Sequence, residues 1–421
     1  MDDDDLMEPR AAVSWMYRRV GFGLAEPELL DAVRRGPVAE LDALLAVDAV
    51  SSASAVDPWH GVDLPITVKD RENAILAINR WLDLMATTTT PVVDRMAWLW
   101  HGHFVSALDK VKYARLMVDQ IRLFRSAGLG PFADLLGAVT IDPAMLLYLD
   151  GTDSTGEHPN ENFGREVMEL FTIGLGGYTE DDVKAGAAAL TGWKVRPAIG
   201  TTSFVPRRHD DMPRMYLGVD GVHDVDTVVT AIMGHPNLAP SIATVVASEL
   251  LGTTDISVVT PLATVFADSD FDIATLVRAT AQAGLDGSSA PIVLAPVPWL
   301  AIAQRVTGSM IDPKLRFVAL RTAGQVPMTP PNVAGWPGGA AWFGSSTVVA
   351  RAQLAAAVAE GAPISNPARQ AADGTDLVRL GESLGLPDPN FSDASSAALT
   401  AASPGVQRLA LALCTPEFVL A

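Results

Sequence analysis

The chain has 421 residues, of which 49% are hydrophobic and 19% are charged, so it is long enough for one large domain or two ordinary domains with substantial cores. Its 49 acidic residues against 30 basic ones give a formal net charge of −19, which disfavours nucleic acid or an anionic membrane surface as a partner. The single cysteine, Cys414, excludes an intramolecular disulfide and a cysteine-based zinc cluster.

The sequence contains no recognisable membrane or export segment. No stretch approaches the roughly twenty apolar residues that a transmembrane helix needs, and no basic segment followed by an apolar run opens the chain. We therefore expect a soluble protein. It acts in the cytoplasm as given, or it is exported and its signal was removed before this N-terminus.

Apolar residues recur at spacings of three and four along most of the chain, and this period is typical of α-helices. Residues 191–226 and 361–403 lack the pattern; the first of these segments contains Trp, Phe and Tyr and is expected to be an ordered, irregular loop with two short strands. We expect two or three helices within 11–48 and further helices at 71–86, 92–101, 111–127, 131–139, 142–149, 160–174, 179–190, 226–234, 238–251, 258–267, 271–284, 296–308, 312–323, 346–360 and 404–413.

The expected fold is therefore mainly α: a large multi-helix assembly with long irregular loops and at most a few short strands. The lapse in periodicity divides the chain into an N-terminal helical half at 1–190, an irregular segment at 191–225 and a C-terminal helical half at 226–421. The two halves pack on each other, or they form one continuous domain.

The segment HPNENFGREVMELFTIG, residues 158–174, is richer in acidic and amide side chains than a helix that only supports a core needs to be. On a helix, a stripe containing Arg165, Glu166 and Glu169 lies opposite the apolar face. Arg165 could pair with Glu161 and Glu169, four residues away on either side, on a solvated face. Alternatively, Glu166 or Glu169 has a raised pKa and acts as general acid or base, while Arg165 binds an anionic group.

Three asparagines are further candidates for contact with a substrate. Asn160 follows Pro159 and is expected to cap the acidic helix, and Asn162 lies on its polar face. Asn332 belongs to the rigid, extended loop PPNVAGWPGG near the C-terminal half. Amide side chains of this kind can donate and accept hydrogen bonds to a ligand.

The segment DRMAWLWHGHF contains His101 and His103 on either side of Gly102. In an unbroken helix the two rings would point about 200° apart, whereas an extended backbone would put both on one side, as in His-x-His metal sites. The pair therefore predicts a divalent metal, zinc, manganese or iron, with Glu161 as a further ligand. The alternative is two histidines whose hydrogen bonds are satisfied in the core.

The irregular segment supplies a third candidate, RRHDD, in which His209 and Asp210 could act as acid, base or metal ligand above the acidic helix. The alternative is an exposed charge cluster. Trp193, Trp336 and Trp342 lie outside the helical pattern, so they could form an aromatic platform for a sugar or peptide, or anchor loops to the core.

Short motifs along the chain carry a family resemblance. They are RRVGFG, DRMAWLWHGHF, IDPAMLLYLDG, PNENFGREVMELFTIG, YTEDDV, ALTGW, HDD, PPNVAGWPGG and CTPEF, in this order. With them the sequence, from about Val20 to Phe418, resembles the bacterial domain of unknown function 1800 family. The resemblance implies a largely helical protein of unassigned activity, often exported and often encoded beside a second uncharacterised, sulfatase-like family. Gly164 departs from the family pattern, in which an alanine is usual.

These features together predict a hydrolase that acts on a glycan or glycoconjugate, by Glu/His acid–base chemistry or by metal-activated water. Its cleft would gather the acidic helix, the WHGHF segment, the HDD loop and the two tryptophan-bearing loops. The alternative is a non-catalytic helical scaffold that binds a partner protein, such as the sulfatase-like protein that the resemblance suggests.

Overall fold

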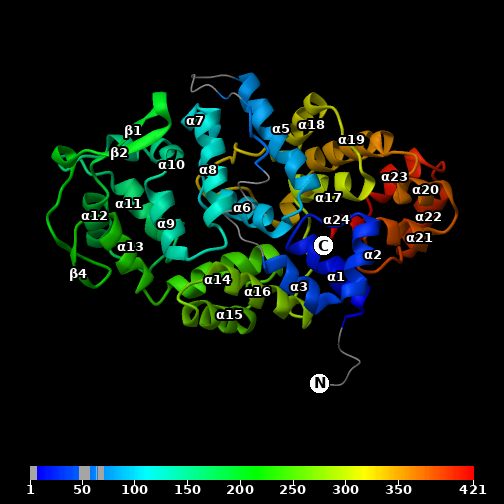
Figure 1. The fold of residues 1–421 in the computed structure, drawn as a ribbon, viewed down its shortest axis with the longest axis horizontal. Coiled ribbons are helices and arrows are strands. Elements are labelled where there is room, and N and C mark those ends of the chain that lie inside the picture. Colours follow the sequence, from blue (N-terminus) through cyan, green and yellow to red (C-terminus); the bar gives the residue numbers. More distant parts are fainter. Residues whose placement is uncertain (1–6, 47–56, 63, 65–70) are drawn as a thin grey trace.

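The computed structural model describes residues 7–46, 57–62, 64 and 71–421. These residues form 23 α-helices, a few 3₁₀ turns and four short strands, so the predicted mainly α fold is confirmed. Within the described ranges, no helix combines the length and the apolar character needed to cross a membrane. Figure 1 shows an elongated molecule with α6 near its middle, the strands at one end and α20–α22 at the other.

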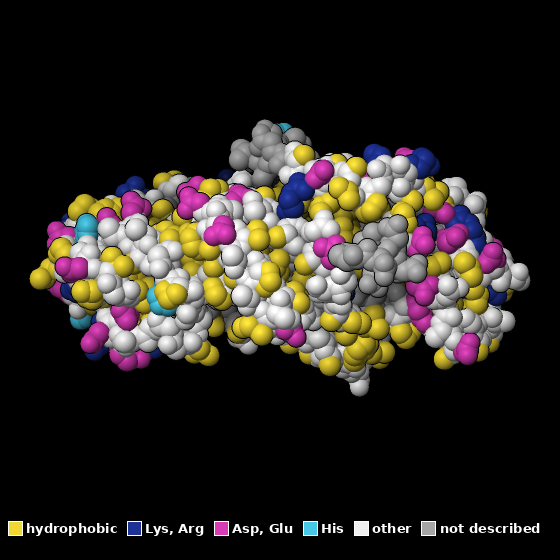
Figure 2. Space-filling model, turned by 90° about the horizontal axis from the view of Figure 1, so that it is seen from below, with side chains coloured by type: hydrophobic (Ala, Val, Ile, Leu, Met, Phe, Trp, Pro, Cys, Tyr) yellow, Lys and Arg dark blue, Asp and Glu magenta, His cyan; other side chains and the backbone are white. Residues whose placement is uncertain are grey.

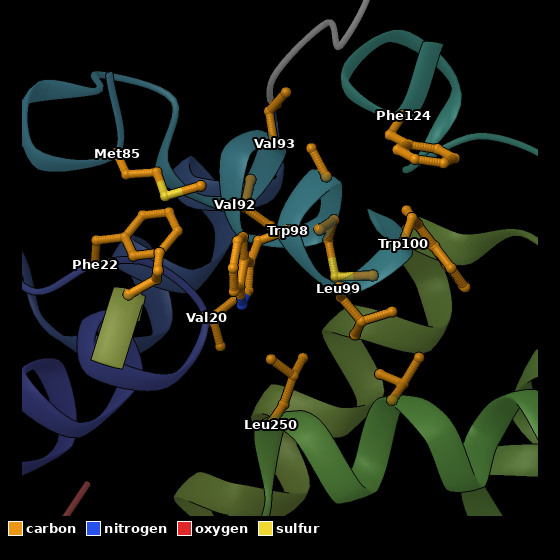
Figure 3. Packing of buried hydrophobic residues seen from close by; sticks show 14 of the residues in the cluster. Val20, Phe22, Met85, Val92, Val93, Trp98, Leu99, Trp100, Phe124 and Leu250 are labelled. Atoms are coloured by element: carbon orange, nitrogen blue, oxygen red, sulfur yellow. The ribbon is translucent and has the colours of Figure 1, made fainter. Parts of the chain in front are cut away.

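Helix α6, Pro91–His103, is the central element, and every residue from 91 to 101 is buried. Pro91 opens the helix at a position where its missing N–H costs nothing. Figure 3 shows Trp98 on the side of Val20 and Trp100 on the side of Phe124, so α6 contributes large side chains in opposite directions. A helix that is apolar on all sides must lie inside the protein, and this burial holds the WHGHF segment in place.

Helix α6 packs against α8 and α5, α17 packs on α5, and α14–α16 form a separate group (Figure 1). Aspartates cap α15 and α16, and α17 begins at a proline and is followed by Gly308, as sequence rules for helix ends predict. The bounds are Arg71–Thr87 for α5, Leu108–Val111 for the short α7, Ala114–Ala127 for α8, Leu238–Leu250 for α14, Ile256–Asp268 for α15, Ile273–Leu285 for α16 and Pro296–Thr307 for α17.

The strand-bearing end contains the acidic helix and the segment predicted to be an irregular loop. That segment folds into two antiparallel hairpins, in which Trp193 pairs with Phe204 and Arg214 pairs with Val222. The elements at this end are α9 Phe132–Thr140, α10 Pro143–Tyr148, α11 Glu161–Glu169, α12 Glu180–Ala189, β1 Trp193–Arg196, β2 Thr201–Phe204, β3 Arg214–Tyr216, β4 Val219–Val222 and α13 Val225–Met233.

Helices from the start of the chain lie beside helices from its end. Arg18 donates to the carbonyl of Phe418 at 2.7 Å, and Ser14 donates to the carbonyl of Gly385 at 2.5 Å. The division of the chain at 190 and 226 stays a prediction. The helices at this end are α1 Pro9–Arg19, α2 Glu26–Arg35, α3 Pro37–Leu45, α18 Pro313–Ala323, α19 Ser345–Gly361, α20 Pro367–Asp373, α21 Leu377–Ser383, α22 Asp393–Ala401, α23 Val406–Ala412 and α24 Pro416–Val419.

The stretch 361–403, which lacked a helical pattern, contains three short helices. Asn366, Asp376 and Ser392 cap them by accepting hydrogen bonds from backbone N–H groups of the first turn. Helices of seven to nine residues show less than three turns of periodicity, so their caps are a stronger signal than their apolar spacing.

The acidic excess is distributed over the surface. Figure 2 shows acidic side chains scattered over one face of the molecule among apolar and uncharged ones. On this face the acidic side chains do not gather into one patch.

Candidate functional site

The WHGHF segment and the PPNVAGWPGG loop meet at a pocket of about 480 Å³. One wall is the C-terminal part of α6, and another is the last two turns of α14, from Thr244 to Glu249. Residues 292–295 and the loop 334–342 complete the lining. A pocket of this size accommodates a small molecule or one or two sugar rings.

Gly335 explains how the loop approaches α6 so closely. Its φ is +81°, a conformation that favours glycine, and a Cβ atom there would lie 2.5 Å from the carbonyl oxygen of Gly102. The backbone of the loop therefore rests directly on the backbone of the WHGHF segment. This contact couples two motifs that are more than two hundred residues apart.

An aromatic stack forms one side of the pocket. The rings of Trp98 and Trp336 lie 5.2 Å apart with 16° between their planes. Trp98 is almost fully buried, Trp336 is half-buried, and the buried Trp342 also lines the pocket. Trp336 and Trp342 thus lie where an aromatic platform was predicted, and their role as a ligand platform stays a prediction.

His103 supplies a neutral imidazole to the same pocket. Its Nε2 lies 3.0 Å from the carbonyl oxygen of Phe171, the residue that ends the acidic segment's buried face. A carbonyl only accepts hydrogen bonds, so Nε2 carries the hydrogen and Nδ1 keeps its lone pair. Burial lowers the pKa of His103 to about 4, against the smaller opposing effect of this hydrogen bond, so the ring is neutral at pH 7.

Arg95 and Glu249 place a paired cation and carboxylate in the wall. The Arg95 guanidinium is 4% exposed, donates to the carbonyl of Arg19 at 3.0 Å and lies 3.0 Å from the Glu249 carboxylate. Its Nη1 atom has no hydrogen-bond partner among the described residues. The Glu249 side chain is 40% exposed, so its carboxylate remains within reach of a ligand.

His101 does not share a metal site with His103. Helix α6 continues through His103, so the extended backbone on which the His-x-His prediction depended is wrong. His101 is fully buried, and its Nε2 accepts a hydrogen bond from the Met328 N–H at 2.9 Å. Glu161 lies elsewhere, exposed in the first turn of α11. Across the described ranges, no three His, Cys, Asp or Glu side chains come close enough to hold a metal ion.

The charged side chains of the acidic helix pair with residues of neighbouring elements. They do not pair with one another along the helix, as was expected for a solvated face. Arg165 forms two hydrogen bonds with Glu180 of α12, at 2.9 and 2.8 Å, and Glu169 accepts a hydrogen bond from Tyr178. The predicted pairs of Arg165 with Glu161 and Glu169 do not form. Burial and the nearby Glu169 raise the pKa of Glu166, as expected for a general acid or base, but Glu166 and Glu169 do not line the pocket.

The predicted asparagines do not line the pocket, and their contact with a substrate stays a prediction. Asn160 caps α11 by accepting from the Phe163 N–H at 3.0 Å, and its amide donates to the carbonyl of Leu149. Asn162 is exposed on α11. Asn332 is exposed and accepts a hydrogen bond from the Ala334 N–H within its own turn.

The HDD segment lies at a second pocket, of about 350 Å³, between β1, β2 and the start of α13. Trp193 and His209 line it, so the single expected cleft is divided between two places that share no lining residue. Asp210 instead lies 2.6 Å from Arg214, whose hydrogen bond holds the pKa of Asp210 below its ordinary value.

Arg95, Glu249, Phe204 and Asp224 line these pockets but did not stand out in the sequence. Arg95 and Glu249 belong to regular helices, where a charged residue usually faces solvent. A usable signal for Arg95 was its place in a largely apolar helix, because a buried charge needs a partner.

The fold and site define a mainly helical protein with two pockets built from tryptophan- and histidine-bearing motifs. The sequence matches, over residues 15–420, the family described as "Protein of unknown function (DUF1800)". The chain therefore belongs to this family, as the motif resemblance predicted. Neither a curated protein sequence nor a solved structure matches it.

Proposed function

We propose that the pocket between α6, α14 and the PPNVAGWPGG loop binds a sugar-bearing substrate and that the chain hydrolyses an acyl linkage on it. The observation that carries this proposal is the juxtaposition of Trp336, stacked on Trp98, with the neutral imidazole of His103. An aromatic face held rigid by a second ring offers a sugar an apolar surface at little cost in side-chain entropy.

His103 is the general base of this proposal. The Phe171 carbonyl fixes its tautomer, so Nδ1 can accept a proton from water as the water oxygen attacks the acyl carbon. The same proton then passes to the leaving oxygen or nitrogen, which releases the free acid and the deacylated sugar. A pKa of about 4 keeps the base unprotonated at pH 7 but makes it a weak one, so we expect slow turnover.

An acyl linkage fits the pocket better than a glycosidic one. Most glycosidases use two carboxylates on either side of the bond, whereas among the described residues one carboxylate lines this pocket, that of Glu249, which is held by Arg95. In this proposal Glu249 orients the substrate by accepting hydrogen bonds from the hydroxyl groups of the sugar. The proposal gives His101 a structural role and needs no metal ligand from it.

The test uses the full chain with O-acetylated and N-acetylated oligosaccharides and their deacylated counterparts. Saturation-transfer NMR reports binding, and acetate release reports turnover. We expect Trp336→Ala to lose binding and His103→Gln to keep binding but lose turnover. The exposed His158, changed to Gln, is the matched control and should alter neither. Binding that survives in Trp336→Ala, or acetate release that survives in His103→Gln, would refute the proposal.

A scaffold that binds a partner protein, such as a sulfatase-like one, is the second candidate. It is favoured by the internal use of several motif residues, above all the fully buried pair of Asp94 and Arg125 at 2.8 Å. Motif residues of this kind hold elements together and need no substrate. Under this alternative, purified chain binds none of the oligosaccharides, and Trp336→Ala lowers stability alone.

A further inference from the structure

The second pocket has a lining of different chemistry from the first. Two aromatic residues, Trp193 and Phe204, line it together with Asp224 and Asp226, and no Lys or Arg is found among the described residues that line it. We propose that this pocket binds an organic cation: a small molecule with a protonated or quaternary ammonium group on an apolar body. The site shares no lining residue with the pocket of the proposed hydrolase and does not depend on that function.

The aromatic half of the site is built by strand register. Trp193 of β1 lies opposite Phe204 of β2, and their rings are 5.3 Å apart. Phe204 also contacts the His209 ring edge to face at 5.1 Å, yet 43% of Phe204 remains exposed. Aromatic faces that are open to a cavity attract cations through their negative π-clouds.

The acidic half of the site is the start of α13. Asp224 caps this helix, with one carboxylate oxygen accepting from the N–H and hydroxyl of Thr227 at 2.9 and 2.6 Å. Burial works against the charge, but these hydrogen bonds and the fields of His223 and His209 outweigh it and lower the pKa of Asp224. Among the described residues, the His223 imidazole, at 3.7 Å, is the ion-pair partner of the second oxygen, which can also accept from a ligand.

The same helix end argues against an anionic ligand. A free helix N-terminus attracts anions, but Asp224 already satisfies this one, and Asp226 adds a second negative charge in the first turn. His209 donates from Nδ1 to the Thr191 carbonyl at 3.0 Å, which leaves Nε2 as an acceptor. An ammonium group would meet two carboxylates, an imidazole nitrogen and two aromatic faces.

The test is isothermal titration calorimetry of the full chain with four probes of similar shape: benzylammonium, benzyltrimethylammonium, benzyl alcohol and benzoate. We expect the two cations to bind with one-to-one stoichiometry, at least tenfold more tightly than the alcohol, and benzoate to give no heat. Tighter or equal binding of the alcohol would instead indicate a neutral ring site and overturn the proposal. So would the absence of heat with both cations.

Variants separate this pocket from non-specific attraction by an acidic protein. Asp224→Asn keeps the helix cap, because asparagine caps as well as aspartate, but removes the charge. Phe204→Leu removes a ring that is already partly exposed, so folding should survive. We expect each to weaken cation binding at least tenfold, while Asp255→Asn, which removes the charge of the α15 cap, leaves it unchanged. Equal effects of the two Asp→Asn changes, or no effect of Asp224→Asn, would refute the site.

Discussion

At the scale of single residues, some polar side chains pair with residues close in the sequence, and others pair with residues of another helix. The sequence predicts the first kind of partner but not the second. Local partners were predictable: Asn160 caps the helix that follows it, as expected from its position. The partner of Arg165 was not, because Glu180 lies on the next helix and reaches Arg165 only after the two helices have packed. Spacing along one helix predicts candidate pairs within that helix. Which pairs form also depends on how the helices pack against each other.

Removal of one partner of the Asp94–Arg125 pair should lower the free energy of unfolding far more than removal of one partner of a surface ion pair. Both side chains are fully buried, and Thr88 also donates to Asp94 at 2.5 Å. Arg125→Met leaves a buried carboxylate without its cation, so we expect the free energy of unfolding in urea to fall by about 3–5 kcal/mol. The double variant Asp94→Leu/Arg125→Met should recover part of this loss. A loss below about 1 kcal/mol, the level of an exposed pair, would contradict this role.

His101 should make the protein sensitive to acid. Burial lowers its pKa from 6.5 to about 3, so the unfolded state binds a proton more readily than the folded state between these values. Its contribution to stability is complete above pH 6.5 and is lost as the pH falls towards 3. His101→Gln should therefore reduce the acid-side slope of unfolding free energy by up to about 1.4 kcal/mol per pH unit. Urea titrations at several pH values measure the slope, and an unchanged slope would count against the buried neutral ring.

At the scale of elements, helix existence was predictable and the ends of helices were less so. The period of three and four identified most long helices, but Gly102 left open whether α6 stopped before His103. In the structure Gly102 belongs to α6, and its carbonyl oxygen lies against Gly335 of the distant loop. This contact comes from a remote part of the chain, so the WHGHF segment alone does not predict it.

Gly335→Ala tests this contact between elements. The added methyl group would lie 2.5 Å from the Gly102 carbonyl and require a strained φ of +81°, so the loop must move away from α6. We expect a loss of about 1–3 kcal/mol in unfolding free energy and weaker oligosaccharide binding. Gly338→Ala, in the same loop with no atom near its Cβ position and a negative φ, is the control for stability and should leave the unfolding free energy unchanged. Equal melting temperatures for the two variants would contradict the predicted packing.

Glu166 tests whether the acidic helix takes part in the chemistry. Its pKa is raised by burial and by Glu169, so its charge opposes folding above that pKa. Glu166→Gln should therefore leave turnover unchanged and make the protein slightly more stable at neutral pH, with the difference shrinking as the pH falls. Thermal melts across pH and acetate release measure the two effects. Abolished turnover in a folded Glu166→Gln variant would move the active site to α11.

At the scale of the whole molecule, the fold class followed from the sequence, and the meeting of distant segments did not. The apolar period determined a mainly α protein, yet Arg18 contacting Phe418 and Trp336 stacking on Trp98 join residues hundreds of positions apart. Such contacts depend on how complete helices pack, which local patterns do not encode. For the same reason the candidate residues were expected in one cleft, whereas some of them line two separate pockets and others, such as Glu166, line neither.

The most direct test of the central claim is the initial rate of acetate release from acetylated oligosaccharides by wild type, His103→Gln and His158→Gln, at equal concentration and with folding verified. If His103 is the general base, wild type and His158→Gln release acetate, whereas His103→Gln releases none but still binds the oligosaccharide in the Trp336 pocket. Release that continues in His103→Gln at the wild-type rate would show that this histidine is not the base and that the pocket is not the site of hydrolysis.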